Sequence, residues 1–175
     1  MKQYNLITTH IRNLKTEKKI KNYFLGNWCI KFNKKNFYKK NLSIFEYHWN
    51  DKKKFNKDYF RIINITENLF KNLARTLNFL HRKKISETEW RIILYPWLIQ
   101  FVTIIFDRWQ TSENFLKKNY KKRFILNYIK SNENVLECLD HLDFAKKSLN
   151  HKWNNYIYKE IFNYLESKII IKKKI

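Results

Sequence analysis

Polar side chains that could do chemistry stand at the ends of predicted elements and form no continuous motif. His48 and Asp51 fall where a predicted strand passes into a predicted helix, which is a usual ligand position in α/β folds. A histidine there can act as a general base, and a nearby aspartate can orient it or bind a cation. The alternative is that Asp51 caps the helix and His48 only packs. These two residues are the candidate catalytic pair.

Asp107 and Arg108 close the longest apolar run, residues 92–106. Neighbouring helical residues point about 100° apart, so in a buried helix these two side chains cannot both be free in solvent without a contact. One reading makes them substrate-binding groups, with Arg108 or Arg91 holding a phosphate or carboxylate. The other reading is a buried ion pair with another element, for which Arg91 is one candidate partner.

Aromatic residues and one glycine complete the candidate set. Trp28 and Trp109, like Trp49 and Trp97, could be stacking platforms for sugar or base rings, although tryptophan is mainly core material. Gly26 is the single glycine of the chain. A lone glycine in an apolar run marks a sharp turn or a close approach of the backbone.

Standard catalytic fingerprints are absent from the sequence. One glycine cannot build a Gly-rich phosphate loop, and HExxH, CxxC and GxSxG do not occur. The two cysteines exclude a disulfide framework and a Cys-rich zinc module, and Cys29 is expected to be a small buried hydrophobe. No metal site and no cofactor are implied. The free thiols, and a polar first ten residues without a signal-peptide core, predict a cytoplasmic protein.

The charge is strongly basic, with 37 Lys+Arg against 15 Asp+Glu and a formal net charge of +22. Such a charge favours nucleic acid or an anionic membrane as partner. However, the excess of Lys, Asn and Ile also follows from AT-rich codons, and arginine, the residue suited to bidentate readout, is scarce. Nucleic acid is therefore the less favoured partner. Lysines and aromatics interleaved over residues 33–40 keep a non-enzymatic binding module, for nucleic acid or an anionic membrane, as the alternative function.

The elements that must position these residues can be read from periodicity. Strands are predicted over residues 4–9, 23–30 and 42–49, and from Asp51 apolar residues recur at helical spacing as far as Leu80. Ser86 to Glu89 has the form of a capping box, so a second helix begins there and is predicted to run to about Trp109, with a bend near Pro96. A short polar turn between the helices makes them an antiparallel hairpin.

The remaining third of the chain is less regular. Residues 124–129 fit a strand or a helical turn, and the pattern leaves both open. Residues 135–165 have a helical period with a break around Asn150, and residues 169–175 are strand-like. The run 92–106 is too short to span a bilayer and is expected to be a buried core helix. The prediction is one α/β domain, residues 1–175, with high helix content.

Five short blocks, in order and spacing, resemble the amino-terminal part of a known family. They are Leu25 to Cys29; His48 to Asp51 with Lys54, Asp58 and Tyr59; Trp90 to Ile92; Pro96 to Leu98; and Phe106 to Trp109. Trp153, Asn154, Tyr158 and Ile161 resemble a later block. The family is the LIC12162 family of transferases, found with proteins of O-antigen and other surface-polysaccharide biosynthesis.

The resemblance implies a fold and a function. Family members are longer, so it implies the N-terminal, Rossmann-like lobe of a two-lobed GT-B-like enzyme, a fragment that need not be active alone. The implied reaction moves a sugar from a nucleotide-activated donor to a glycan or lipid-linked acceptor, with peripheral contact to the anionic inner membrane. The matching candidate residues are Gly26, Trp28, His48, Asp51, Arg91, Asp107, Arg108 and Trp109. Asn50 stands where an acidic residue is expected, which argues against a metal there.

Overall fold

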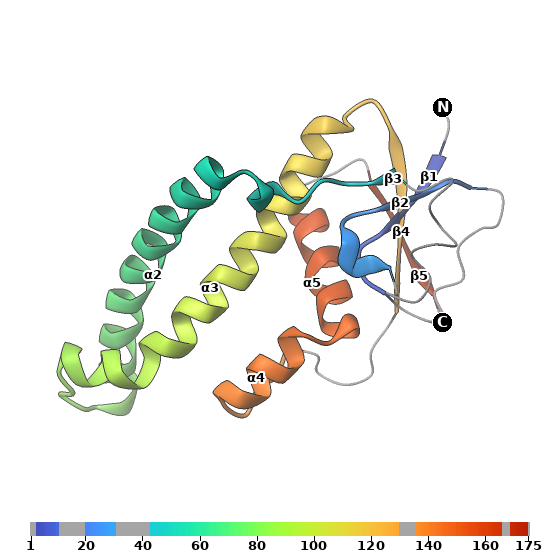
Figure 1. Ribbon diagram of the computed structural model, residues 1–175. Coiled ribbons are helices and arrows are strands. Elements are labelled where there is room, and N and C mark those ends of the chain that lie inside the picture. The colour runs from blue at the N-terminus through green and yellow to red at the C-terminus, as the bar shows by residue number, and fades with distance from the viewer. Residues whose placement is uncertain (1–2, 11–19, 31–42, 130–135, 166–168, 175) are drawn as a thin grey trace. The chain divides into compact units, whose positions relative to one another are not determined.

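The computed structural model describes residues 3–10, 20–30, 43–129, 136–165 and 169–174 (Figure 1). The chain divides into two compact units. The sheet unit comprises Met1–Tyr47 and Arg108–Ile175, and the hairpin unit comprises His48–Asp107. The Lys-rich segment 33–40, proposed above as a possible nucleic-acid site, lies outside the described residues.

The sheet unit contains five parallel strands in the order β3-β2-β1-β4-β5. Their bounds are β1 Gln3–Ile7, β2 Asn22–Phe24, β3 Ser43–Ile44, β4 Arg123–Ile129 and β5 Ile169–Lys174. The chain builds β2 and β3 on one side of β1 and then returns to place β4 on the other side. This order is the first five positions of the doubly wound 3-2-1-4-5-6 arrangement, whose direction of winding switches between β1 and β4.

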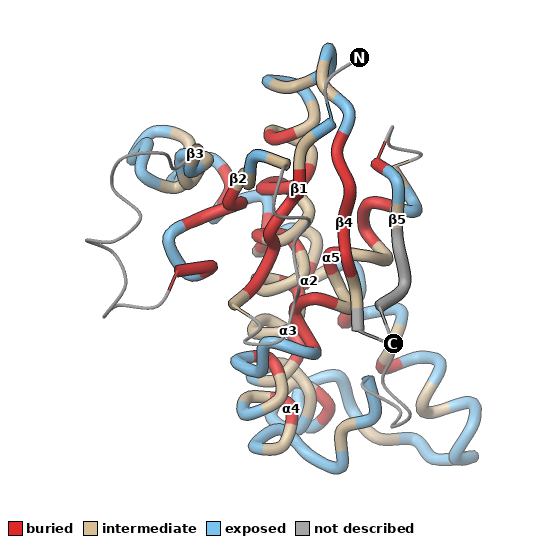
Figure 2. Tube along the Cα trace, turned by 90° about the vertical axis from the view of Figure 1, so that its right-hand side faces the viewer, coloured by how far each residue is buried: buried red, intermediate tan, exposed pale blue. Residues whose placement is uncertain are grey.

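The central strands are the most buried part of the sheet. Leu6 and Leu126 are fully buried, and Figure 2 shows β1 and β4 coloured as buried along much of their length. Near-continuous apolar runs of this kind are expected for parallel strands covered on both faces. The run 124–129, which the sequence left open, is therefore a strand. The predicted strand over residues 42–49 is wrong in extent, because β3 covers only Ser43–Ile44.

Two helices follow β4 in the sheet unit, α4 (His141–Ser148) and α5 (His151–Tyr164). The side chain of Asn150 accepts a hydrogen bond from the backbone N–H of Lys152 and so caps α5, which confirms the predicted break. Helix α5 packs along β4 (Figure 1) and buries Tyr158 and Phe162 in the core of this unit. Helix α4 begins at His141, later than the helical period suggested, because the side chain of Asp140 caps it.

The hairpin unit consists of α2 (Lys52–His81) and the first part of α3 (Glu87–Lys118). The capping box is formed: the Ser86 hydroxyl accepts from the Glu89 backbone N–H at 3.3 Å, and Glu89 accepts from the Ser86 backbone N–H at 2.8 Å. Arg82 ends α2 in the left-handed conformation, with φ of 52°. These local signals fix the turn between the two helices.

Apolar side chains spaced along both helices form the core of the hairpin unit. From α2 it includes Ile62, Phe70 and Ala74, and α3 contributes a matching row: Trp90, Leu98, Val102 and Phe106. The Trp90 indole N–H also donates to the Asn78 side chain at 3.0 Å. The two helices are therefore joined by interdigitated side chains, as expected for an antiparallel pair.

Helix α3 continues to Lys118, so the predicted end near Trp109 is wrong. The sequence turns polar at Gln110, Thr111 and Ser112, yet all three are buried. The Ser112 hydroxyl donates to the Arg108 carbonyl at 2.8 Å, so the helix itself satisfies this buried hydroxyl.

Among the described residues, α3 alone is long and apolar enough to cross a membrane, and its apolar window is only 22% buried. The expectation that residues 92–106 form a buried core helix is therefore wrong: Ile92 and Ile93 are 74% and 60% exposed, because only the row with Leu98, Val102 and Phe106 faces the core of the hairpin unit.

Candidate functional site

His48 lies in a short 3-10 turn, η3 (His48–Asn50), which leads directly into α2. Its Nε2 is 3.1 Å from Asp107 Oδ1 and its Nδ1 is 3.8 Å from Asp58 Oδ2. The side chains of His48, Asp58 and Asp107 are 3%, 5% and 7% exposed. The imidazole is therefore held between two buried carboxylates from the two helices of the hairpin unit.

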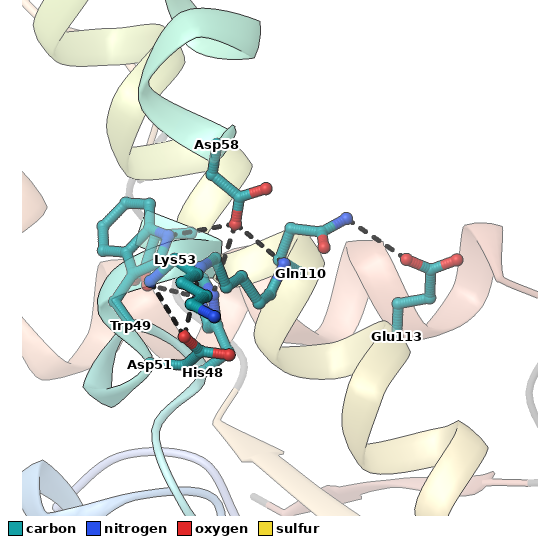
Figure 3. A network of polar contacts seen from close by, with 9 residues as sticks. His48, Trp49, Asp51, Lys53, Asp58, Gln110 and Glu113 are labelled. Carbon is teal, nitrogen blue, oxygen red and sulfur yellow. Dashed lines mark hydrogen bonds and ion pairs between the residues drawn. The ribbon is translucent and has the colours of Figure 1, made fainter. Parts of the chain in front are cut away.

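Asp58 has two further donors in the same unit (Figure 3). The Trp49 indole N–H donates to Asp58 Oδ2 at 3.1 Å, and the Lys54 ammonium donates to the same oxygen at 2.8 Å. A buried carboxylate is tolerated only when it is paired in this way. We call His48, Trp49, Lys54, Asp58 and Asp107 the carboxylate–histidine cluster.

Asp51 does not point its carboxylate at His48 in this arrangement. It is exposed, and its Oδ1 accepts from the backbone N–H groups of Lys53 and Lys54 at 2.9 and 3.2 Å. This is helix capping, the structural alternative raised for Asp51 from sequence. The partner of Asp107 also differs from the candidate named above, because Asp107 pairs with His48 and not with Arg91.

Arg91 belongs to a separate contact of the hairpin unit. Its guanidinium donates to both carboxylate oxygens of Glu67, at 2.8 and 2.9 Å, and stacks over the rings of Phe70 and Tyr95. The hydrogen bonds from Arg91 lower the pKa of Glu67 from 4.5 to about 2. Bidentate pairing with aromatic stacking is the geometry that arginine is suited to. To bind a substrate anion, Arg91 would have to exchange this partner.

A second polar cluster lies in the sheet unit, at the carboxyl end of β1. Thr8 and Thr9 follow the strand directly and are 2% and 3% exposed. The Asn155 side chain of α5 donates to Thr8 Oγ1 at 3.2 Å and to the Asn127 carbonyl of β4 at 3.4 Å. The amide thus connects β1 and β4, the two strands between which the winding direction switches.

Three sequence-predicted residues join this cluster. The Trp28 indole N–H donates to the Thr8 carbonyl at 3.0 Å. Gly26 lies under the Trp28 ring, and a Cβ there would come within 2.1 Å of a ring carbon. Its φ of −177° is extended backbone, so the glycine is required for space and not for conformation. Arg108 Nε donates to Asn154 Oδ1 in the first turn of α5, at 3.1 Å.

Histidines complete the edge. The His10 ring, two residues beyond Thr8, stands edge-on to the His151 ring at the start of α5, with centroids 5.7 Å apart. The Thr9 hydroxyl is buried without a hydrogen-bond partner in the part of the chain that the structure describes. We call this group the carboxyl-edge cluster; its members are Thr8, Thr9, His10, Gly26, Trp28, Arg108, His151, Asn154 and Asn155. Such an edge is where open parallel sheets bind ligands.

Two other candidates lie apart from both clusters. The Trp109 ring packs against Tyr164, at the far end of α5 from His151, with centroids 5.3 Å apart. The Cys29 thiol is buried and donates to the Ile7 carbonyl, and burial raises its pKa to about 12. A thiol in that state is a poor nucleophile, in keeping with the packing role expected of it. No group of three or more metal-ligating side chains is arranged for a metal ion within the described residues.

Sequence analysis did not single out His10, Thr8, Thr9 or Asn155. A usable signal existed for the first three, because polar residues directly after an apolar parallel strand lie at the ligand-binding edge. Asn155 could be placed there only once the pairing of β1 with β4 was known, since 147 residues separate it from Thr8.

An open parallel sheet with helices defines an α/β protein. The chain belongs to the family described as LIC12162 family transferase, whose model matches residues 4–174. No curated protein and no solved structure matches the chain. The family confirms that the protein is a transferase-family member, as the sequence blocks indicated.

Proposed function

We propose that this chain is the Rossmann-like lobe of a GT-B-like glycosyltransferase acting in surface-polysaccharide (O-antigen) assembly. It would help to move a sugar from a nucleotide-activated donor to a glycan or lipid-linked acceptor. Support comes from the transferase family and from the parallel sheet with its carboxyl-edge cluster. The observation that carries the proposal is that Gly26 and Trp28 lie at that edge, at the switch between β1 and β4, and that Arg108 contacts the first turn of α5, whose Asn155 bonds to Thr8 at the same edge.

The substrate-binding roles follow from the chemistry of the groups. The Trp28 ring is 37% exposed and offers a face on which a sugar ring can stack. Arg108 is half-buried and carries a guanidinium suited to a phosphate or carboxylate of donor or acceptor. Of the two arginines named from sequence, Arg108 suits this role better by position, because it contacts the first turn of α5 in the sheet unit, whereas Arg91 belongs to the hairpin unit.

Sugar transfer also needs a base. The acceptor hydroxyl gives its proton to the base and its oxygen bonds to the anomeric carbon, while the bond from that carbon to the diphosphate breaks and the nucleoside diphosphate leaves. His10 is the better placed histidine, because it lies half-buried at the carboxyl edge; its Nε2 is buried, so Nδ1 is the nitrogen that would take the proton. His48, the candidate from sequence, has a side chain only 3% exposed between two carboxylates. We assign the base to His10 and a positioning role to His48.

The test is a transfer assay on the full-length protein as its cell makes it. Nucleotide-activated sugars are offered one at a time with a lipid extract, and nucleoside diphosphate release is followed together with the mass of the product. We expect acceptor-dependent release with at least one donor. His10→Gln should lower kcat at least tenfold and flatten the acid side of its pH profile, and Arg108→Gln should mainly raise KM.

A matched variant separates the two histidines. His48→Gln is expected to lower stability while the surviving folded enzyme keeps the pH profile of the parent. If His48→Gln lost the pH dependence and His10→Gln kept it, the general base would be His48 and not His10. Absence of acceptor-dependent release with every donor would contradict the proposed reaction.

A further inference from the structure

We propose that the first turns of α2 are a docking surface for an anionic lipid bilayer. We call this surface the basic–aromatic face; it consists of Lys52, Lys53, Lys57, Tyr59, Phe60 and Arg61. All of them are exposed in the hairpin unit. The inference does not rest on the proposed sugar transfer, since it concerns only what this surface binds.

Two large aromatic side chains are exposed on the face. Tyr59 is 53% exposed and Phe60 is 67% exposed, and their rings are in edge contact with centroids 5.5 Å apart. The nearest acid on the same helix, Asp58, is buried and held by Trp49 and Lys54. Residues 52–61 therefore expose four basic side chains and no acidic one.

Helix geometry gathers these residues on one side. At about 100° per residue, Tyr59, Lys52, Phe60, Lys53, Lys57 and Arg61 fall within an arc of roughly 200°, and Phe60 lies near its centre. Asp58 falls on the opposite side, toward the carboxylate–histidine cluster, and Lys54 falls next to Arg61, whose guanidinium stacks over the Phe106 ring at 5.5 Å. The helix thus presents lysines around Phe60, with Tyr59 and Arg61 at the two margins of the face.

The position of the lysines is unfavourable for the helix alone. The first turn of α2 contains Lys52, Lys53 and Lys54 and no acidic residue, although the positive end of the helix dipole favours acids there. Residues that break a local rule without a local gain point to a function. The Asp51 carboxylate already caps this helix terminus, so an anionic partner would compensate the remaining positive charge of Lys52, Lys53 and Lys57.

A bilayer fits the face better than a nucleic acid does. Interfacial helices combine lysine or arginine with exposed bulky aromatics that enter the boundary between headgroups and acyl chains. Three of the four basic residues are lysines, which are less suited than arginine to bidentate readout of phosphates or bases. Docking by this face would bring the adjoining end of the hairpin unit, with His48 and Asp107, to the surface where lipid-linked acceptors reside.

The test is sedimentation of the purified chain with phosphatidylcholine vesicles, with and without phosphatidylglycerol. The variant K52Q/K53Q/K57Q is compared with K71Q/K83Q/K84Q, which removes the same charge from exposed positions at the other end of α2 and its turn. At about 1 kcal/mol per lysine near an anionic surface, the first triple variant should bind on the order of 100-fold more weakly. The control should lose much less, because Lys71 lies about 15 Å of helix beyond Arg61, and Lys83 and Lys84 lie farther along the chain.

A second matched pair tests the aromatic part. Phe60→Ser should weaken vesicle binding about tenfold, whereas Phe79→Ser, at an 82% exposed position of the same helix, should leave it unchanged. Circular dichroism checks that each variant keeps its helices. Equal losses in both members of either pair, or no binding to phosphatidylglycerol vesicles by the parent, would overturn the proposal. It would equally be overturned if the first triple variant lost oligonucleotide binding but kept its vesicle binding.

Discussion

The two polar clusters are built from different kinds of groups. The carboxylate–histidine cluster of the hairpin unit buries two aspartates and a histidine, and the half-buried Lys54 forms an ion pair with Asp58. The carboxyl-edge cluster of the sheet unit is joined by neutral hydroxyl, amide, carbonyl and indole groups, with Arg108 as its one permanent charge. In the carboxylate–histidine cluster, the charged groups contact one another. The carboxyl-edge cluster lies at the edge where open parallel sheets bind ligands.

This difference separates stability from function. A buried ion pair that loses one member leaves an uncompensated charge, so its residues are expected to matter first for folding. When a neutral group at a sheet edge is removed, the protein loses less stability than when a buried charge loses its partner. We therefore expect the largest stability effects in the hairpin unit and the largest effects on substrate binding in the sheet unit.

The largest effect is expected for Asp58→Ala. The change removes the acceptor of Trp49 and Lys54 and one of the two carboxylates facing His48. Loss of about 3 kcal/mol in the free energy of unfolding follows for a broken buried pair. Urea unfolding followed by helical circular dichroism measures it. A loss below about 1 kcal/mol would mean that pairing of the charged groups does not stabilise this cluster.

A smaller effect is expected for Asn155→Ala in the neutral cluster. It leaves the Thr8 hydroxyl and the Asn127 carbonyl without this donor, which costs about 1–3 kcal/mol for buried groups. Adding Thr8→Val should recover part of that loss, because the orphaned hydroxyl is removed as well. If Asn155→Ala cost as much as Asp58→Ala, the distinction between the two clusters would fail.

A pair of changes at Asp51 separates capping from catalysis. Asp51→Ala should cost about 1 kcal/mol of stability, whereas Asp51→Ser keeps a side-chain oxygen for the Lys53 and Lys54 backbone N–H groups and should cost little. Thermal unfolding gives both values. If Asp51→Ser kept its stability but lost transfer activity, the carboxylate would have a catalytic role in addition to the cap.

The smallest effect is a pH dependence from Glu67. Its pKa is lowered from 4.5 to about 2 by Arg91, so the folded state binds the proton less tightly than the unfolded state. The stabilisation is present above pH 4.5 and is lost as the pH falls toward 2. Comparing urea midpoints of the parent and Glu67→Gln between these pH values measures it. The variant should lack this part of the acid slope, which solvent screening keeps small; an unchanged slope would contradict the assignment.

Much of the hairpin unit could be predicted from the sequence because its signals are local. The capping box at Ser86, the cap at Asp51 and the helical period of α2 each lie within a few residues of the structure they specify. The end of α3 could not be found in this way, because Thr111 and Ser112 are polar residues in a buried turn.

The structure of the sheet unit was harder to predict from the sequence, for a physical reason. Its site depends on which strands become neighbours, and no local pattern states that β1 pairs with β4 or that α5 starts beside His10. Gly26 was expected to mark a sharp turn or a close approach of the backbone, and the structure shows a close approach, with the Trp28 ring against it. His10 directly follows the apolar segment of β1, but that position marks the ligand-binding edge only once the strand is known to pair in parallel, and no local pattern states this.

The central claim, that substrate binds at the carboxyl-edge cluster, is tested most directly by hydrogen–deuterium exchange. The full-length protein is measured with and without a saturating donor or acceptor that it is shown to turn over. Slower exchange is predicted in residues 8–10, 26–28 and 151–155, with Arg108→Gln reducing the protection. If residues 8–10, 26–28 and 151–155 keep their exchange rates while those around His48 and Asp58 slow down, the claim is wrong.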